Sequence, residues 1–390
     1  MTKRVVIGLS GGVDSSVAAL ILKEKGYDVT AVFMINWHDK TGILKGDCPW
    51  DQDIIFAEIV AKRIGIPFQV IDLSEKYREK VVEYMFSEYQ NGRTPNPDIL
   101  CNRDIKFNEF FTVLEKFNAD YIATGHYCRT TALEKNGKIT HSLLAGNDPG
   151  KDQSYFLCQL NQYQLSKTLF PIGHLQKSEV REMARKACLA SAEKKDSQGI
   201  CFVGKVNLPE FLQQKLKAIE GPILEVPFES EIFNKKIDLN YKQICQAWKY
   251  SVNDGIIVGK HHGAHFFTIG QRKGLNVGGK PEPLFVLATD TENNIIYTGQ
   301  GQDHPGLFRK GLFIHAKDIH WINPDLEMQA GEERNYKVRV RYRQPLQKAH
   351  LMREQEGMYI TFSDLQRGIA PGQFAAWYEG EELLGSGIID

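Results

Sequence analysis

A glycine-rich turn near the beginning of the sequence has the composition of a phosphate-binding loop. The residues SGGVDSS (10–16) follow one apolar run and precede a second with helical spacing. This pattern predicts a strand, a tight turn and a helix. The nucleotide loop met most often, GxxxxGK[ST], carries a lysine for the outer phosphates. Here an aspartate and two serines follow the glycines, so the loop predicts a phosphate ligand without the usual lysine.

The missing lysine changes the reaction that such a loop favours. It leaves less positive charge at the terminal phosphate, which is the group that P-loop enzymes transfer or hydrolyse. A loop of backbone amides suits pyrophosphate as a leaving group, and we therefore expect attack at the α-phosphorus and an adenylated substrate. Asp14 would lie beside the phosphates and help to hold Mg²⁺. A glycine turn with an ordinary helix cap is the alternative, but the full motif after a strand favours the nucleotide.

Two cysteines lie in stretches that favour a reactive thiol. Cys101 stands in GRTPNPDILCNRDIKF (92–107), where two prolines restrict the backbone and three cationic side chains are close in sequence. Nearby cations and a helix start favour the thiolate form of a cysteine. Cys201 stands in KKDSQGICFVG (194–204), a charged stretch with glycines on both sides. The alternative is a small buried hydrophobe, which we expect of the remaining cysteines: Cys48, Cys128, Cys158, Cys188 and Cys245.

The first half of the chain predicts a scaffold that brings such loops together. From Arg4 to about Phe202, short β-rich runs alternate with amphipathic helical stretches. The predicted strands are Val5–Leu9, Val29–Ile35, Phe68–Leu73 and Tyr121–Thr124. The predicted helices are Ser15–Lys25, Asp51–Ile64, Tyr77–Gln90 and Lys106–Phe117. Strands and helices in this order form a parallel sheet covered on both faces, with ligands at the carboxyl ends of the strands.

The second half has a different texture. Residues 206–275 mix one helical piece, Leu208–Ile219, with short strands, and from about Leu284 the runs are short and alternating, separated by turns. We therefore predict an α/β protein with three domains. They are a Rossmann-like parallel-sheet domain (1–205), a small mixed central domain (206–280) and a C-terminal antiparallel β-barrel (281–390).

Composition excludes several classes of protein. The formal net charge is zero, so a nucleic-acid surface would have to come from local basic patches. The apolar runs are too short to span a membrane, and the first residues do not resemble a signal peptide. The seven cysteines are scattered without a CxxC pair, which argues against a disulfide scaffold and a zinc site. We expect a soluble, cytoplasmic protein with reduced thiols and no metal site of its own.

The motif SGGVDSS is the signature of the PP-loop ATP pyrophosphatases, and the chain resembles them there. Further motifs make the resemblance narrower, because they recur in the same order over nearly the whole chain in the tRNA-specific 2-thiouridylase family. They are GLSGGVDSS, GRTPNPDILCNRDIKF, ATGHY, KDQSYFL, DSQGICFVG, TIGQRKGL, VRYRQ and PGQ. One departure is visible: residues 222–260 are longer than the short hairpin usual before TIGQRKGL.

This resemblance implies a set of site residues. The residues that would contact ATP are Gly8, Leu9, Ser10, Gly11, Gly12, Val13, Asp14, Ser15, Met34 and Gly125. Cys101 would be the nucleophile and Cys201 the carrier of a persulfide sulfur, while Asn96, Pro97 and Asp98 would face the target uracil. The residues that would touch tRNA are His126, Lys151, Asp152, Gln153, Arg341, Tyr342 and Gln373. The domain 1–205 would be catalytic and the domain 206–280 would bind tRNA.

The implied reaction is ATP-dependent 2-thiolation of the wobble uridine of tRNA. Adenylation of the C2 oxygen would create a leaving group, and the Cys201 persulfide would then deliver sulfur and end in a disulfide with Cys101. Asp98 would act as an acid or base, or only orient the base. The implied partners are the anticodon arm of tRNAs for Lys, Glu and Gln, Mg²⁺ with ATP, and a persulfide donor protein. An AMP-forming ligase and a noncatalytic RNA-binding protein that keeps ATP are the alternatives.

Overall fold

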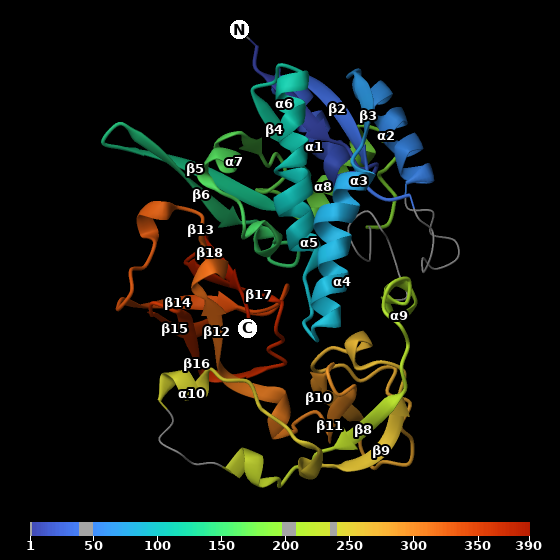
Figure 1. The fold of residues 1–390 in the computed structure, drawn as a ribbon. Coiled ribbons are helices and arrows are strands. Elements are labelled where there is room, and N and C mark those ends of the chain that lie inside the picture. Colours follow the sequence, from blue (N-terminus) through green and yellow to red (C-terminus); the bar gives the residue numbers. More distant parts are fainter. Residues whose placement is uncertain (1, 39–49, 197–207, 235–239) are drawn as a thin grey trace.

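The computed structural model describes residues 2–38, 50–196, 208–234 and 240–390. Cys48 and Cys201 lie outside the described residues. Within the described ranges, the helices are too short and too polar to cross a bilayer. Figure 1 shows a parallel-sheet domain (blue to green), a central sheet (yellow to orange) and a C-terminal β-rich domain (orange to red).

A five-stranded parallel sheet forms the core of the first domain. Its order is β3 (Phe68–Asp72), β2 (Asp28–Ile35), β1 (Arg4–Gly8), β4 (Tyr121–Ala123) and β7 (Thr168–Leu169), and all pairs are parallel. The chain leaves β1 toward β2 and β3 and returns on the other side at β4. Residues after β1 and after β4 therefore meet at a topological switch point, where open α/β sheets bind their ligands.

Helices cover both faces of this sheet, as the sequence predicts. On one face, Val5 and Ile7 of β1 pack in a buried cluster with residues of α1 (Val13–Glu24), α2 (Asp51–Ile64) and α8 (Lys177–Lys186). On the other face, Val6 packs in a second cluster with helical segments between 74 and 116. Those segments are α3 (Ser74–Tyr77), the π-helical turn Arg78–Val82, α4 (Glu83–Gln90), α5 (Pro97–Leu100), the π-helical turn Cys101–Lys106 and α6 (Thr112–Lys116).

The central sheet has four strands in the order β10 (Leu284–Asp290), β11 (Ile295–Gln300), β8 (Gly221–Glu225) and β9 (Ile256–His261). The boundary expected at residue 280 therefore falls between strands of one sheet, and a division by sheets would come after Gln300. The short helix α9 (Leu208–Leu212) precedes this sheet.

The long stretch 222–260 runs from β8 to β9 of the central sheet, and its helix packs against the C-terminal domain. Its helix α10 (Tyr241–Ile244) lies against β12 and β16. The Lys242 ammonium pairs with Glu356 at 2.7 Å, and the Trp248 indole nitrogen donates to the Phe308 carbonyl at 3.0 Å. The described part of this stretch around α10 and Trp248 therefore packs against the C-terminal sheet.

The C-terminal domain is an antiparallel β structure, as predicted. Its strands are β12 (Phe308–His315), β13 (Ile319–Trp321), β14 (Glu333–Arg339), β15 (Gln347–Arg353), β16 (Gly357–Arg367), β17 (Phe374–Glu379) and β18 (Glu382–Ile388). Two strands from the first domain, β5 (Cys128–Lys135) and β6 (Lys138–Ala145), extend the sheet because β6 pairs with β18 (Figure 1). The helix α7 (Gln162–Ser166) contacts β6.

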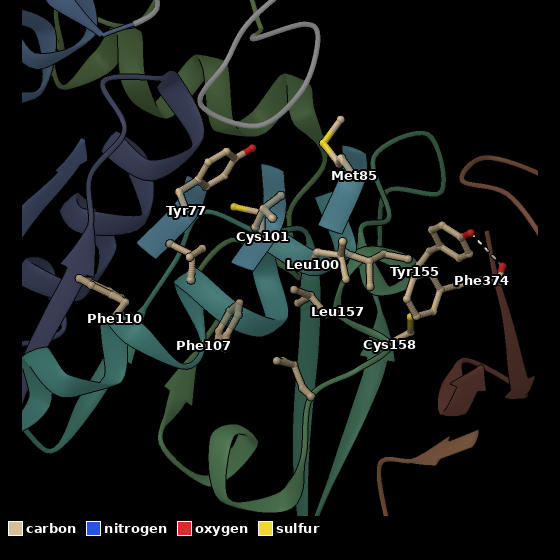
Figure 2. Close-up of a cluster of buried hydrophobic side chains, with 14 of the residues drawn as sticks. Tyr77, Met85, Leu100, Cys101, Phe107, Phe110, Tyr155, Leu157, Cys158 and Phe374 are labelled. Carbon is tan, nitrogen blue, oxygen red and sulfur yellow. Dashed lines mark hydrogen bonds between the residues drawn. The ribbon is translucent and has the colours of Figure 1, made fainter. Parts of the chain in front are cut away.

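One hydrophobic cluster joins the first and last domains. Tyr155 and Cys158 from the first domain lie in it with Phe374 and Tyr378 from β17. The Tyr155 hydroxyl donates to the Phe374 carbonyl at 2.9 Å, as Figure 2 shows. The catalytic domain expected at 1–205 therefore shares its core with the barrel.

Candidate active site

The glycine loop joins β1 to α1 at the carboxyl edge of the parallel sheet. The Leu9 amide donates to the Val32 carbonyl at 2.9 Å and so continues the pairing of β1. The Ser15 hydroxyl closes the turn, because it accepts from the Ser10 amide at 3.1 Å. Gly12 is the N-cap of α1 and makes no side-chain capping bond. The amides of this first helical turn therefore form an anion-binding position.

Three neighbouring strands meet at this loop. A Cβ built on Gly125, two residues after β4, would lie 2.6 Å from the Ser15 amide nitrogen. A Cβ on Gly8, the last residue of β1, would lie 3.3 Å from the Cε of Met34 in β2. Gly11 has a φ of 73°, and its Cβ would lie 2.2 Å from a backbone oxygen. The residues that the motifs assign to ATP are therefore close together at the switch point, and the glycines there allow the close approach.

The carboxylate of Asp14 in the first turn of α1 is held by two later parts of the chain. The Tyr127 hydroxyl donates to its Oδ1 at 2.8 Å. The Lys177 Nζ donates to Oδ1 at 2.7 Å and to Oδ2 at 2.8 Å. Burial, followed by the Asp14 charge, raises the pKa of Tyr127, so this hydroxyl stays protonated as a donor.

A network of ion pairs continues from Lys177 to Asp196. The Asp196 carboxylate accepts from Lys177 at 2.8 Å, from Lys151 at 2.6 Å and from Arg181 at 2.8 Å. Burial would raise the pKa of Asp196, but hydrogen bonds from Lys151 and Lys177 outweigh it and lower this pKa to about 2. Asp196 is therefore ionised at neutral pH and is the last described residue before the range that contains Cys201.

A further lysine, Lys194, contacts the glycine loop directly. Its Nζ donates to the Gly11 carbonyl at 3.2 Å and pairs with Asp53, and it lies 4.6 Å from the centre of the Phe56 ring. The loop lacks a lysine in its own motif, but lysines from much later in the sequence surround it. Sequence reasoning missed Lys177 and Lys194.

One feature of the sequence around Lys177 could have indicated a role in the site. This residue begins α8, where the helix dipole disfavours a cation. A residue that breaks a local rule of this kind often belongs to a functional site.

The fit to a magnesium ion rests on a single carboxylate. In the described parts of the chain, no group of three or more histidine, cysteine or acidic side chains is arranged to hold a metal. Asp14 is the acidic residue of the glycine loop, and Lys177 and Tyr127 already bond to it. Mg²⁺ that arrives with a nucleotide keeps phosphate oxygens and water as its main ligands and needs only one or two carboxylates.

Cys101 is part of the protein core, which corrects the expectation of a loop cysteine. Asn96 caps a helix whose first residue is Pro97, since its Oδ1 accepts from the Ile99 amide at 3.2 Å. The helix runs into the π-helical turn that Cys101 begins. Pro97 therefore starts a helix, whereas Pro95 precedes the N-cap residue.

The thiol of Cys101 is inaccessible in this structure. The residue is 0% exposed and lies in the cluster that contains Tyr77, Met85 and Leu100 (Figure 2). The guanidinium of Arg103, one of the expected cationic neighbours, pairs with Asp104 at 2.9 Å. The core around Cys101 must open before its sulfur can meet a macromolecular substrate.

The segment just before Asn96 is fastened to the C-terminal domain. The Gln373 Nε2 donates to the Thr94 carbonyl at 2.8 Å and to the Pro95 carbonyl at 3.2 Å. Its Oε1 accepts from the Asn96 Nδ2 at 3.4 Å. The Arg93 guanidinium pairs with Asp390 at 3.0 Å. Gln373, which the resemblance assigns to tRNA, thus holds the segment that would face the target uracil.

The three residues Lys151, Asp152 and Gln153 also have partners inside the protein. Lys151 pairs with Asp196, and the Gln153 Oε1 accepts from the Tyr127 amide at 3.0 Å. Asp152 is buried and pairs with Arg339 of β14 at 3.2 Å. Lys151 and Gln153 are partly exposed, whereas Asp152 is buried.

His126 lies inside the fold and not on its surface. Its Nδ1 is 2.7 Å from the Thr124 hydroxyl, and its ring packs against Phe107 and Phe170. Burial, with a smaller contribution from the Lys106 charge, lowers the pKa of His126 well below its usual value. A neutral, buried imidazole is suited to holding the segment after β4 in place.

Arg341 and Tyr342, which the resemblance assigns to tRNA, lie in the turn after β14. The Arg341 guanidinium donates to the Gly368 carbonyl at 2.5 Å, and burial lowers its pKa. The centre of the Tyr342 ring lies 4.3 Å from the centre of the Phe156 ring. The guanidinium carbon of Arg343 lies 5.2 Å from the centre of the Tyr342 ring. This turn therefore contacts the first domain.

Three of the cysteines expected to be inert are buried as predicted. Burial raises the pKa of Cys128, and it raises the pKa of Cys158 and of Cys245 to about 12. Cys188 contradicts the expectation, because it follows α8 with a φ of 51° and is exposed. A turn at the end of an amphipathic helix placed it outside the core.

Models of known families match most of the chain. Residues 3–205 match the tRNA methyl transferase HUP domain, residues 249–300 the tRNA methyl transferase PRC-barrel domain, and residues 313–389 the aminomethyltransferase beta-barrel domain. These matches cover the parallel-sheet domain, part of the central sheet and most of the C-terminal strands.

Full-length relatives carry a more specific name. The chain is 57% identical to the tRNA-specific 2-thiouridylase MnmA of Christiangramia forsetii, over 99% of this chain and 100% of the relative. It is 55% identical to the protein of the same name from Flavobacterium johnsoniae, over 99% and 100%. A third, from Karelsulcia muelleri, is 45% identical over 99% and 98%. The domain descriptions mention methyl transfer, but full-length identity of this extent decides the family.

Proposed function

The chain belongs to the tRNA-specific 2-thiouridylase family, and on this premise we propose that it replaces the C2 oxygen of the wobble uridine of tRNA by sulfur, with ATP as the activating nucleotide. One observation carries the proposal. Met34 of β2 lies at the carboxyl edge of the parallel sheet, where the glycine loop begins. Met34 and Cys101 belong to the same buried cluster on one face of this sheet. This common face supports the proposal that the glycine loop and the candidate sulfur nucleophile act in one site.

The first step is adenylation of the base. The uridine O2 attacks the α-phosphorus of ATP, the bond from that phosphorus to the bridging oxygen breaks, and pyrophosphate leaves with the electron pair. The N3 proton must leave as well, so that the adenylated base is neutral. Asp98, beside Asn96 and Pro97, is the candidate base for this proton, and an orienting hydrogen bond from its carboxylate is the alternative role. The lysine-free loop suits pyrophosphate as the leaving group.

Sulfur transfer follows by one of two balanced routes. In the first, the Cys101 thiolate attacks the inner sulfur of the Cys201 persulfide, and the released hydrosulfide attacks C2 and expels AMP. In the second, the persulfide attacks C2 and expels AMP, and Cys101 then attacks the Cys201 sulfur to release the thiocarbonyl. Both routes form a Cys101–Cys201 disulfide, which a thiol reductant must reduce before the next turnover.

The partners follow from this reaction. We propose the anticodon arm of tRNAs for Lys, Glu and Gln as substrate, and a persulfide-carrying protein as sulfur donor. Mg²⁺ would enter with ATP, with Asp14 as the nearest carboxylate, and would neutralise phosphate charge. His126, Lys151, Asp152, Gln153, Arg341, Tyr342 and Gln373 stay proposed tRNA contacts, several of them needing to exchange an internal partner for RNA. A cytoplasmic location stays a prediction.

Mass spectrometry of tRNA nucleosides tests the proposal. Wild-type protein incubated with tRNA, ATP and a persulfide donor should form 2-thiouridine, with AMP and pyrophosphate released only when tRNA is present. The Cys201→Ser protein should release pyrophosphate without thiolation, and Cys101→Ser should stop after at most one turnover. Cys188→Ser, at an exposed cysteine, is the matched control and should thiolate normally.

Two outcomes would contradict the proposal. Stoichiometric ADP and phosphate would exclude adenylation. Full thiolation by Cys101→Ser or by Cys201→Ser with a protein persulfide donor would exclude the two-cysteine mechanism. Pyrophosphate release that needs tRNA also separates this enzyme from an RNA-binding protein that merely keeps ATP.

A further inference from the structure

Lys177 occupies an unfavourable position for a lysine. It is the first residue of α8, and a cation at a helix N-terminus opposes the helix dipole. Its side chain is only 13% exposed, so it also loses most of its hydration. Two carboxylates compensate, since Asp14 binds the ammonium through both oxygens and Asp196 binds it at 2.8 Å.

The position of the Lys177 ammonium indicates what this side chain can bind. Asp14 belongs to the first turn of α1, the anion-binding end of the glycine loop. The Nζ of Lys177, 2.7 Å from the Asp14 carboxylate, therefore lies beside the first turn of α1, although Lys177 follows Asp14 by 163 residues in the sequence. Lys194 also contacts the loop, but its partners there are the Gly11 carbonyl, Asp53 and the Phe56 ring, and not the carboxylate at the start of α1.

Pyrophosphate departure creates negative charge beside a carboxylate. When the bond between the α-phosphorus and the bridging oxygen breaks, the electron pair goes to that oxygen. In the proposed reaction the glycine loop would hold this oxygen at the start of α1. Preorganised cations aimed at developing charge stabilise such a transition state. An ionised Asp14 without a counter-ion would oppose it, and the motif itself contains no lysine.

We propose that Lys177 is the missing cation of the glycine loop, and that its ammonium turns from Asp14 to the β-phosphate oxygens of ATP and of the leaving pyrophosphate. The ammonium stays protonated and transfers no proton, so the adenylation written above keeps its balance. Asp196 keeps the ammonium in place during the exchange. This inference rests on the proposed function and adds to it a residue that touches the reacting group.

Ligand binding to the full-length protein tests the contact without catalysis. Calorimetry with ATP, pyrophosphate and adenosine should compare wild type, Lys177→Gln and Lys177→Arg. Lys177→Gln should weaken ATP and pyrophosphate by about 10-fold or more, the usual loss for one charge-assisted hydrogen bond, and leave adenosine unchanged. Lys177→Arg should retain part of the affinity. The control is Lys186→Gln, on the same helix but exposed and paired with Glu182, which should bind all three as wild type does.

A structural role gives a different pattern. If Lys177 only held α8 in place, adenosine and ATP would weaken together, and the proposal would be wrong. Unchanged affinity for all three ligands would also overturn it.

A double variant separates direct contact from neutralisation of Asp14. If Lys177 only cancels the Asp14 charge, the double variant Asp14→Asn with Lys177→Gln should bind ATP as tightly as Asp14→Asn alone. That result would exclude a direct contact between Lys177 and phosphate. If Lys177 binds phosphate, the double variant should stay weaker than Asp14→Asn. These measurements need neither tRNA nor sulfur, so their result does not depend on whether the wild-type protein thiolates tRNA.

Discussion

At the scale of single residues, burial decides which cysteine can react in the resting protein. Cys101 is 0% exposed in an apolar cluster, whereas Cys188 lies exposed after a helix. The candidate nucleophile is therefore protected from solvent. Cys188, the exposed cysteine among the described residues, has no role in the proposed chemistry. Protection of this kind prevents loss of a reactive sulfur to small oxidants.

We predict that Cys188 is alkylated well before Cys101 in the protein without ligands. Iodoacetamide reacts with accessible thiolates, and core packing must open to expose Cys101. Mass spectrometry of peptides after timed alkylation measures both rates in one sample. Adding ATP and tRNA should speed the reaction of Cys101 but not that of Cys188. Equal rates for the two cysteines without ligands would contradict the buried position.

The low pKa of Asp196 predicts how its ion pairs depend on pH. Its folded pKa of about 2 lies below the ordinary 3.8, so the carboxylate stabilises the fold where the unfolded chain is also ionised, above about 3.8. This contribution declines as the pH falls from about 3.8 towards 2. The difference in free energy of unfolding between wild type and Asp196→Asn should therefore be constant from pH 7 to pH 5 and shrink below pH 4.

The control for Asp196 is Asp325→Asn. Asp325 pairs with Lys138 at the surface, where both side chains are more than half exposed. Such a pair contributes about 0–1 kcal/mol, so this variant should differ little from wild type at any pH. A difference for Asp196→Asn that grows as the pH falls would contradict the direction of the shift.

At the scale of elements, the segment 93–96 is positioned by the turn before β17, near the other end of the sequence. Gln373 bonds to the carbonyls of Thr94 and Pro95, and the Thr94 amide donates to the Pro371 carbonyl at 2.7 Å. A Cβ on Gly372 would lie 3.0 Å from three backbone atoms of Thr94, and its φ is 87°. The helix that starts at Pro97 therefore takes its direction from the C-terminal domain.

We predict that Gln373→Ala lowers the rate of thiolation more than the affinity for tRNA. The variant removes the three hydrogen bonds that the Gln373 amide makes with Thr94, Pro95 and Asn96, which would cost about 10-fold in rate. Single-turnover thiolation gives the rate, and tRNA binding at one stated salt concentration gives the affinity. The control is Gln347→Ala, whose amide bonds to the nearby Pro345 carbonyl. A loss of affinity with an unchanged rate would instead assign Gln373 to tRNA.

At the scale of the whole molecule, the first and last domains form one cooperative unit. The β5–β6 hairpin pairs with β18, and the cluster around Tyr155 continues into β17. Truncation after residue 280 would remove these partners and leave Asp152 buried without Arg339. We therefore expect the truncated chain to lose stability, so that a loss of tRNA affinity in it would not isolate the barrel's contacts.

A single interdomain ion pair gives a cleaner test of this unit. Arg339 and Asp152 have side chains only 11% and 7% exposed. Arg339→Ala should destabilise the protein by about 3–5 kcal/mol, because it leaves a buried carboxylate without its counter-ion. Urea unfolding followed by circular dichroism measures the loss. Lys138→Ala, which breaks the exposed pair with Asp325 between the same domains, should cost about 0–1 kcal/mol. Equal losses would show that burial is not the cause.

The sequence by itself determined the fold class and the position of the glycine loop, because both follow from local patterns of residues. Alternating strands and helices dictate a parallel sheet, and SGGVDSS after Val5–Leu9 must lie at its carboxyl edge. The order of the short motifs also identified the family, which full-length relatives confirm. These features depend on neighbours within a few residues, which a sequence displays directly.

Only the tertiary structure decided which distant side chains complete the site. No spacing rule joins Lys177 to Asp14 or Gln373 to Thr94, because each pair is separated by well over a hundred residues and meets only when sheets pack. The burial of Cys101 was misjudged for the same reason: its sequence neighbours are charged and proline-rich, but its neighbours in space are Tyr77 and Met85. Exposure and charge pairing are properties of packing, and the sequence carries them only through the fold.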